Sequence, residues 1–151
     1  MVKILHPDYP SNENTLLRLY ALDDGGLDCD TAVTAAGIVA GNSWDGFLAT
    51  RDLSSGDLVR VPRPPDGILR GRAYFFDLPH VAERPYPVTV RFDDWHFPHG
   101  RPPPIWREAR RDGAFWESEP CRLTGARWAV KQAHVVPSSA QTWWTREWMA
   151  R

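Results

Sequence analysis

The chain has 151 residues, of which 42% are hydrophobic, and a formal net charge of −1. This length suits one domain with a substantial core, so we expect a single domain over residues 1–151. No stretch approaches the roughly 18–20 consecutive apolar residues of a membrane span, and two cysteines cannot form a disulfide framework. We therefore expect a cytoplasmic protein, and the near-neutral charge argues against a nucleic-acid partner.

Tryptophan and proline are the two unusual components. The chain has 8 Trp and 14 Pro. Tryptophan suits cores, interfaces and apolar ligand pockets, because it combines a large ring with one N–H donor. Proline limits regular structure and favours long fixed loops. Together they predict a loop-rich α+β domain and not a helical bundle.

The first half of the chain predicts a strand and a helix. Residues 1–14 could form an extended arm before them. Residues 15–22 (TLLRLYAL) have the apolar spacing of a strand. Residues 31–40 predict a helix, because Ala and Val recur on one face and Asp30 or Thr31 can cap its start. The small side chains would let this helix lie close against a sheet.

Short strands and irregular loops are predicted for most of the remainder. The strands are expected at residues 44–51, 58–62, 72–79 and 88–92. A hairpin follows over residues 121–136, and a Trp-rich helix then runs to the end of the chain, capped by Ser138 or Ser139. The predicted fold class is α+β, with a small mixed or antiparallel sheet, one small-residue helix and a C-terminal β-hairpin–helix.

The region CRLTGARWAVKQAHVVPSSAQTWWTREWM carries an ordered series of short motifs. It resembles the HNH-endonuclease-like (ββα-metal) proteins of filamentous fungi, and upstream segments such as LLRLYALDDGG, WDGFL and AYFFDLP are similar too. The residues that match that pattern are Cys121, Thr124, Gly125, Ala133, His134, Val135, Val136, Pro137, Trp143, Trp144 and Met149. The resemblance implies an HNH-like ββα element over residues 121–150.

In that family the hairpin histidine activates water, and a metal held by later residues stabilises the phosphoryl charge. His134 matches the histidine, but no Asn or His follows it in this sequence, so the metal site is not completed. We favour a protein that ends here and has lost the metal chemistry. The alternative is a metal-dependent HNH-type nuclease seen as an incomplete chain.

The leading functional hypothesis is a metal-free and cofactor-independent cyclase, isomerase or binder of an apolar small molecule, repurposed for biosynthesis in secondary metabolism. His134 is the candidate catalytic residue. The candidate substrate-binding residues, which would line an aromatic pocket, are Trp95, Trp128, Trp143, Trp144, Trp148 and Tyr74. A further alternative is a non-catalytic interaction domain that dimerises through the terminal helix, where Ala140, Trp144 and Trp148 would share a face.

Overall fold

The structure, a computed structural model, describes residues 1–21, 25–103, 105 and 140–148. The chain divides into two compact units, Met1–Arg107 and Glu108–Arg151. The first unit contains a sheet and the longer helix. In the second unit the described residues form one short helix.

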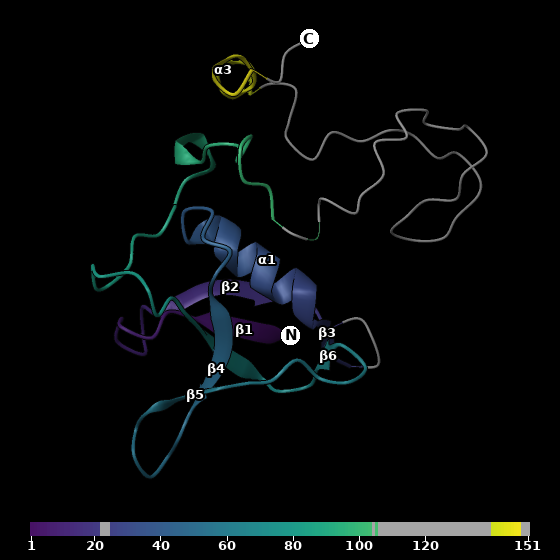
Figure 1. Ribbon diagram of the computed structural model, residues 1–151, viewed down its shortest axis with the longest axis vertical. Coiled ribbons are helices and arrows are strands. Elements are labelled where there is room, and N and C mark those ends of the chain that lie inside the picture. The colour runs from purple at the N-terminus through teal and green to yellow at the C-terminus, as the bar shows by residue number, and fades with distance from the viewer. Residues whose placement is uncertain (22–24, 104, 106–139, 149–151) are drawn as a thin grey trace, which may run out of the picture. The chain divides into compact units, whose positions relative to one another are not determined.

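A five-stranded mixed sheet forms the centre of the first unit (Figure 1). In spatial order its strands are β2 (Thr15–Leu19), β1 (Val2–Leu5), β7 (Ala73–Asp77), β4 (Phe47–Arg51) and β5 (Leu58–Arg60). β1 runs parallel to β7, and the other pairs are antiparallel. The α+β class and the mixed sheet are therefore as predicted. The expected hairpin at residues 121–136 lies outside the described residues.

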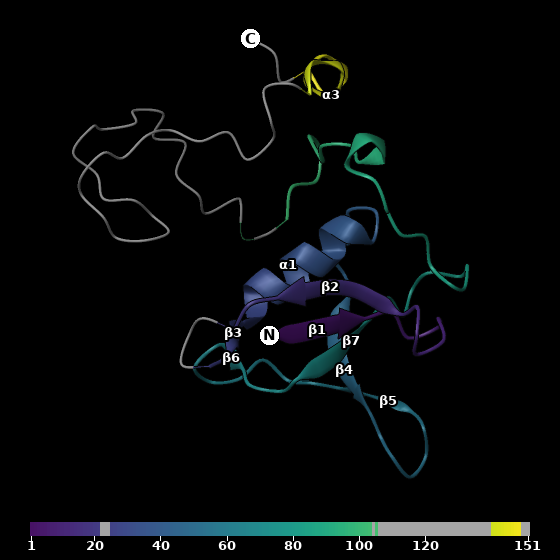
Figure 2. The same ribbon diagram turned by 180° about the vertical axis from the view of Figure 1, so that it is seen from behind.

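The chain begins with a central strand, which corrects the expectation of an extended arm over residues 1–14. β1 lies between β2 and β7, as Figure 2 shows from behind. Val2 and Ile4 bury their side chains, with exposed fractions of 3% and 0%. Four residues are too few for a period of two to stand out in the sequence, so the pattern did not predict this strand.

Helix α1 (Cys29–Val39) packs against the sheet. It begins two residues before the predicted start, because the carboxylate of Asp28 accepts a hydrogen bond of 2.7 Å from the Thr31 N–H and caps it. Gly37 lets the following loop pass close to the helix. A Cβ there would lie 2.6 Å from the Ser43 carbonyl oxygen and 2.9 Å from the Trp44 ring.

A two-stranded sheet of β3 (Leu27–Asp28) and β6 (Ile68–Leu69) lies at the start of α1. The Cys29 N–H, at the first turn of the helix, donates to the Gly67 carbonyl oxygen at 2.8 Å. The chain after β5 is thereby held at the N-terminal end of α1. Strands of two residues leave no periodic signal, and the sequence did not predict them.

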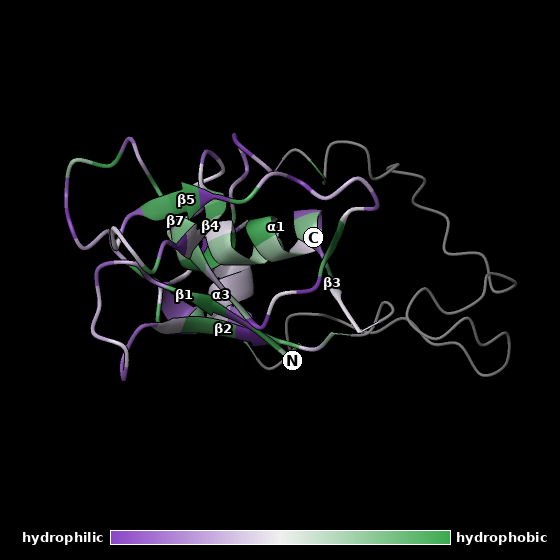
Figure 3. Ribbon diagram, turned by 90° about the horizontal axis from the view of Figure 1, so that it is seen from below, coloured by the Kyte–Doolittle hydropathy of each residue, from purple (hydrophilic) through white to green (hydrophobic). Residues whose placement is uncertain are grey.

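The core of the first unit lies between α1 and one face of the sheet. Figure 3 shows predominantly white and green ribbon on α1 and much green on β1, β4 and β7, which supply this core. Small residues of the helix meet large residues of the strands, as the small-residue pattern predicted. The buried core residues are Val2, Ile4, Leu27, Cys29, Ala32, Ala36, Ala40, Leu48, Leu69, Tyr74, Phe76, Leu78 and Tyr86.

Residues 88–92 do not form the predicted strand. The Thr89 N–H donates instead to the carbonyl oxygen of Val39 at 2.8 Å, at the end of α1. The last carbonyl groups of a helix have no partner within it, and this segment satisfies one of them. A single 3₁₀ turn, η1 (Phe92–Asp94), follows. VTVRF therefore contacts a helix end through its backbone and takes no part in the sheet pairing of the described strands.

Helix α3 (Gln141–Arg146) is the described part of the predicted C-terminal helix. It ends before Trp148, which has a positive φ of 56° and an exposed fraction of 85%. The predicted face of Ala140, Trp144 and Trp148 is therefore not formed. Across the described ranges, none of the helices combines the length and apolar character required to cross a membrane.

Candidate functional site

The sheet has a second face, opposite the α1 core, and we call it the open face. Side chains alternate between the two faces of a strand. Ile4, Leu48 and Phe76 are buried on the core side, so the residues on either side of them in β1, β4 and β7 point to the open face. The cross-strand register identifies the residues of β2 and β5 on the same face. The open face consists of Lys3, Leu5, Arg18, Phe47, Ala49, Arg51, Leu58, Arg60, Ala73, Phe75 and Asp77.

Apolar side chains form the floor of the open face. Phe47, Phe75, Leu5 and Leu58 are half-buried, yet none of them belongs to the core beneath α1. Ala49 is fully buried at 0% and is also absent from that core. The two phenylalanines lie on the adjacent strands β4 and β7. Phe75 pairs with Ala49, and Phe47 pairs with Asp77, two residues after Phe75. They are thus diagonal neighbours.

Four exposed cations surround this floor: Lys3, Arg18, Arg51 and Arg60. Arg18 pairs with Lys3 across β2 and β1. Lys3 pairs with Ala73 on β7. Continuing the antiparallel register of β7 with β4 places Arg51 opposite Ala73. A basic row therefore crosses four strands, which at about 4.8 Å per strand spacing is about 14 Å long.

Each phenylalanine of the floor carries one arginine. The guanidinium carbon of Arg51 lies 4.8 Å from the Phe75 ring centroid, and that of Arg60 lies 4.8 Å from the Phe47 centroid. Arg51 is also held by two hydrogen bonds, to Gly56 O at 2.7 Å and to Pro7 O at 3.2 Å. The ring contact is the one side-chain interaction of Arg60 among the described residues.

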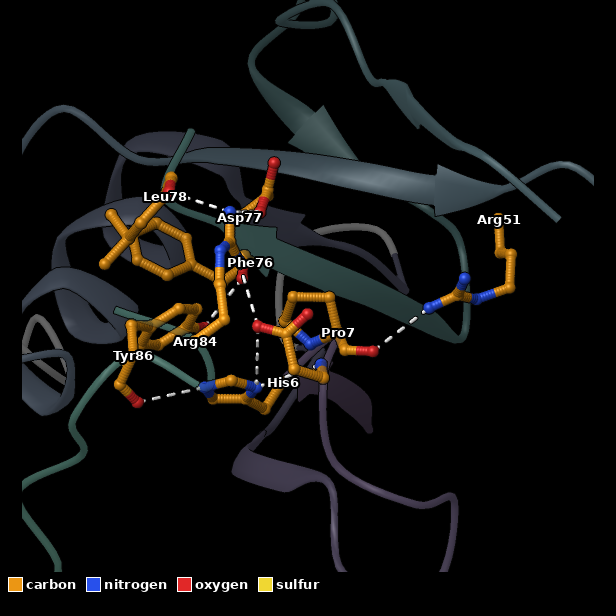
Figure 4. Close-up of polar contacts among 9 residues, drawn as sticks. His6, Pro7, Arg51, Phe76, Asp77, Leu78, Arg84 and Tyr86 are labelled. Carbon is orange, nitrogen blue, oxygen red and sulfur yellow. Dashed lines mark hydrogen bonds and ion pairs between the residues drawn. The ribbon is translucent and has the colours of Figure 1, made fainter. Parts of the chain in front are cut away.

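The carboxylate of the open face, Asp77, is paired. Arg84 donates to Asp77 Oδ1 at 3.0 Å, to Asp8 Oδ2 at 3.0 Å and to the Leu78 carbonyl oxygen at 2.9 Å (Figure 4). Burial alone would lower the pKa of Arg84, but the two carboxylates outweigh it and raise the pKa. Asp77 therefore contributes little free negative charge beside the four cations.

His6 lies directly after β1 and is fully buried, at 0%. Its Nδ1 accepts a hydrogen bond of 3.1 Å from the Asp8 N–H. The proton is therefore on Nε2, which donates to the Tyr86 carbonyl oxygen at 3.2 Å. Burial lowers the pKa of His6 below its usual 6.5, although the Tyr86 carbonyl and the Asp8 carboxylate act in the opposite direction. The ring is thus a neutral imidazole at neutral pH.

Tyr86 completes this polar cluster, which also contains His6, Asp8, Asp77 and Arg84. Its hydroxyl group donates to the Phe76 carbonyl oxygen at 2.7 Å, and its ring lies 3.8 Å from the His6 ring between centroids. Burial, followed by the negative charge of Asp77, raises the pKa of Tyr86 well above 10. Both rings are inaccessible to a ligand, so the cluster is built to hold the strand ends and not to transfer protons.

Tyr74, a predicted pocket residue, lies in the core with an exposed fraction of 7%. Its hydroxyl oxygen accepts a hydrogen bond of 2.7 Å from the Gly71 N–H. This side chain closes the turn before β7 and faces α1, on the side of the sheet away from the open face. The prediction that Tyr74 contacts a substrate is not supported by its position.

Trp95 is half-buried beyond the end of α1. Its Nε1 donates to Asn42 Oδ1 at 2.9 Å, and Asn42 Nδ2 donates to the His96 carbonyl oxygen at 2.8 Å. The ring lies 6.0 Å from that of Phe97 between centroids, edge on. Trp95 therefore anchors the segment after η1 to the helix end, which is a structural role.

Trp143, Trp144 and Trp148 belong to the second unit. Trp143 is buried at 3%, and its ring contacts that of Trp144 with centroids 5.6 Å apart. Tyr74 and Trp95 belong to the first unit. His134 and Trp128 lie outside the described residues, so the catalytic role proposed for His134 stays a prediction.

Metal-binding and thiol chemistry find little support in the described part of the chain. No group of three or more His, Cys, Asp or Glu side chains there could hold a metal ion. Cys29 is a free, buried thiol, and burial together with the Asp30 charge raises its pKa. A buried thiol with a raised pKa is a poor nucleophile.

The open face was not predicted from the sequence. One signal was present, because Phe47, Ala49 and Arg51 alternate with Leu48 along β4. The basic row, however, combines Lys3 and Arg18 with residues that follow much later, and only strand pairing brings them together.

Neither family models, nor curated proteins, nor solved structures gave any match to this chain.

Proposed function

We propose that this protein is a binding module that holds an extended polyanionic ligand on the open face of its sheet. The observation that carries the proposal is the set of four exposed cations, Lys3, Arg18, Arg51 and Arg60, over a half-buried apolar floor. Clustered cations on one face attract polyanions, even in a protein with a net charge of −1.

The charge balance of the face supports this. Four cations stand against one carboxylate, Asp77, and that carboxylate is already bound by Arg84. Two exposed arginines elsewhere in the first unit are neutralised in contrast: Arg63 pairs with Asp30 at 2.9 Å and Arg70 pairs with Asp66 at 2.6 Å. Among the described residues, none of the four cations of the open face forms an ion pair with a carboxylate.

A binding role also fits the polar cluster better than catalysis does. His6 and Tyr86 are fully buried, and every buried side-chain nitrogen and oxygen in the described residues has a partner. A general acid or base needs access to its substrate within hydrogen-bonding distance. The cluster has no such access, and it fixes the strand ends that carry the open face.

Retention on a heparin column tests the proposal. The full chain should bind at low salt, and the triple variant Lys3→Gln/Arg18→Gln/Arg60→Gln should lose about tenfold or more in affinity, since each lost phosphate- or sulfate-type contact weakens binding. The matched control is Arg63→Gln/Arg70→Gln/Arg91→Gln. It removes the same net charge from arginines that are already ion-paired.

The control should retain most of the wild-type affinity. Equal losses in the two triple variants would mean that only net charge matters, and the open face would then not be a binding site. Circular dichroism of both variants establishes that each is folded.

A further inference from the structure

We infer that the polyanion is a single-stranded nucleic acid, with one base stacked on the ring of Phe47 and the sugar–phosphate backbone following the basic row from Arg51 to Arg18. This inference rests on the proposed function and deepens it. The cations of the open face would attract any polyanion. The aromatic rings of the floor identify the ligand class, because they favour a polyanion that carries planar bases.

Phe47 has the geometry of a stacking platform. It lies at the start of β4 and is half-buried, and the guanidinium carbon of Arg60 lies over one face of its ring, 4.8 Å from the centroid. A planar guanidinium and a nucleobase both stack on an aromatic face. A base can therefore replace Arg60 on the ring without disturbing any hydrogen bond of that arginine.

Arg60 gains a role when a base displaces it. As its one side-chain interaction in the described residues is the Phe47 ring, its five N–H donors are available to a phosphate group. A bidentate arginine–phosphate contact is among the stronger hydrogen-bonded pairs. When the base binds, the Phe47 ring exchanges its contact with Arg60 for a contact with the base. Arg60 exchanges its contact with the ring for a contact with a phosphate group. Both residues therefore gain a favourable ligand contact.

Phe75 is not equivalent to Phe47. Arg51, which covers it, is fixed by hydrogen bonds to Gly56 O and Pro7 O. Displacing Arg51 would break both bonds, so we expect Arg51 to remain over Phe75 and to act as the first cation of the backbone track. Lys3 and Arg18 continue the track, which at about 14 Å is long enough for a few nucleotides.

The aromatic ring selects single strands over duplexes and over acidic peptides. In a duplex the base planes are covered by their neighbours, so a ring on a sheet can reach them only in unpaired segments. An acidic peptide offers charge without planar bases. Near-neutral composition argued against a nucleic-acid partner, but the relevant charge is local to one face of the sheet.

Fluorescence anisotropy with three probes tests the inference: a labelled oligothymidylate of about 12 nucleotides, a duplex of equal length, and labelled heparin. The full chain should bind the oligothymidylate more tightly than the duplex. Phe47→Leu should weaken oligothymidylate binding by about 5- to 160-fold, the range for loss of one stacked base, and should leave heparin binding unchanged. Phe47→Tyr should restore the affinity, because a phenol ring also stacks.

Two further variants sharpen the result. Tyr20→Leu removes an exposed aromatic ring (76% exposed) from beyond the end of β2 and should leave all affinities unchanged. Lys3→Gln/Arg18→Gln should lower the slope of log affinity against log salt by about 1.4, at about 0.7 per phosphate contact.

Equal binding of duplex and single strand, or full oligothymidylate affinity in Phe47→Leu, would overturn the inference. If heparin still depends on the face cations in that case, the proposed polyanion site stands. If a polyglutamate peptide displaces the oligothymidylate at equal charge concentration, stacking contributes nothing and the ligand is an acidic peptide. Loss of face-dependent binding to every probe would overturn the proposed function itself.

Discussion

His6 donates a hydrogen bond from Nε2 to the carbonyl oxygen of Tyr86, 80 positions later in the chain, at 3.2 Å. Both residues are fully buried. The bond joins the residue after β1 to the segment that follows β7. Both strands contribute side chains to the open face. Because β1 and β7 are parallel neighbours, their C-terminal ends lie side by side at the same end of the sheet. The His6–Tyr86 contact fixes the chain at that end.

His6→Gln should destabilise the protein by about 1–3 kcal/mol, because the amide can replace only part of the two hydrogen bonds and loses the ring contact with Tyr86. Urea denaturation measures this change. His80→Gln is the matched control, since His80 is exposed, and it should stay within about 0.5 kcal/mol of wild type. Equal stability of the two variants would contradict the structural role of His6.

The stability of the protein should fall as the pH drops below the usual His pKa of 6.5. Burial lowers the pKa of His6 in the folded state, so the unfolded chain binds more protons between the two values, and stability rises with pH there. Unfolding free energies from about pH 7.5 to about pH 5.5 should therefore decrease more steeply for wild type than for His6→Gln. Parallel curves for the two proteins would show that His6 does not titrate as inferred.

Tyr86→Phe should cost about 1–3 kcal/mol of stability, since the Phe76 carbonyl oxygen loses its donor in a site without access to water. The hydroxyl group contributes this bond at 2.7 Å, and Tyr86 is 0% exposed. Tyr20→Phe removes an exposed hydroxyl group and serves as the control. Thermal denaturation that leaves both variants at the wild-type midpoint would exclude the buried bond.

Gly46→Ala should destabilise the first unit by about 1–3 kcal/mol or more through overpacking. A Cβ at this position would clash with the ring of Phe76 and with Leu78, both buried in the core. Gly100→Ala is the control, because no atom of the described residues, apart from its two chain neighbours, lies within 4 Å of its Cβ position. A neutral Gly46→Ala variant in chemical denaturation would mean that the Phe76 ring can move aside.

Local sequence patterns predicted the elements that are long and periodic. The expected strands at residues 15–22, 44–51, 58–62 and 72–79 each contain an observed strand. The small-residue helix is confirmed within two residues at its start and one at its end. These predictions succeed because alternation and helical spacing arise from burial of one face, which the sequence records directly.

Elements that depend on distant partners were missed or misassigned. Residues 2–5 become a strand only because β2 and β7 lie on either side of them. Residues 88–92 alternate like a strand, yet they bond to the end of α1. In both cases the deciding hydrogen bonds reach residues that local periodicity does not include.

The sequence by itself determined an α+β chain with alternating strands, one small-residue helix and a net charge of −1. Only the tertiary structure decided that Lys3 and Arg18 share one face with Phe47, Arg51 and Arg60. It also decided that Tyr74 and Trp95, which looked like pocket residues, are engaged in the core and at a helix end. The physical reason is that composition averages charge and aromaticity over the chain, whereas binding depends on the surface on which strand pairing places them.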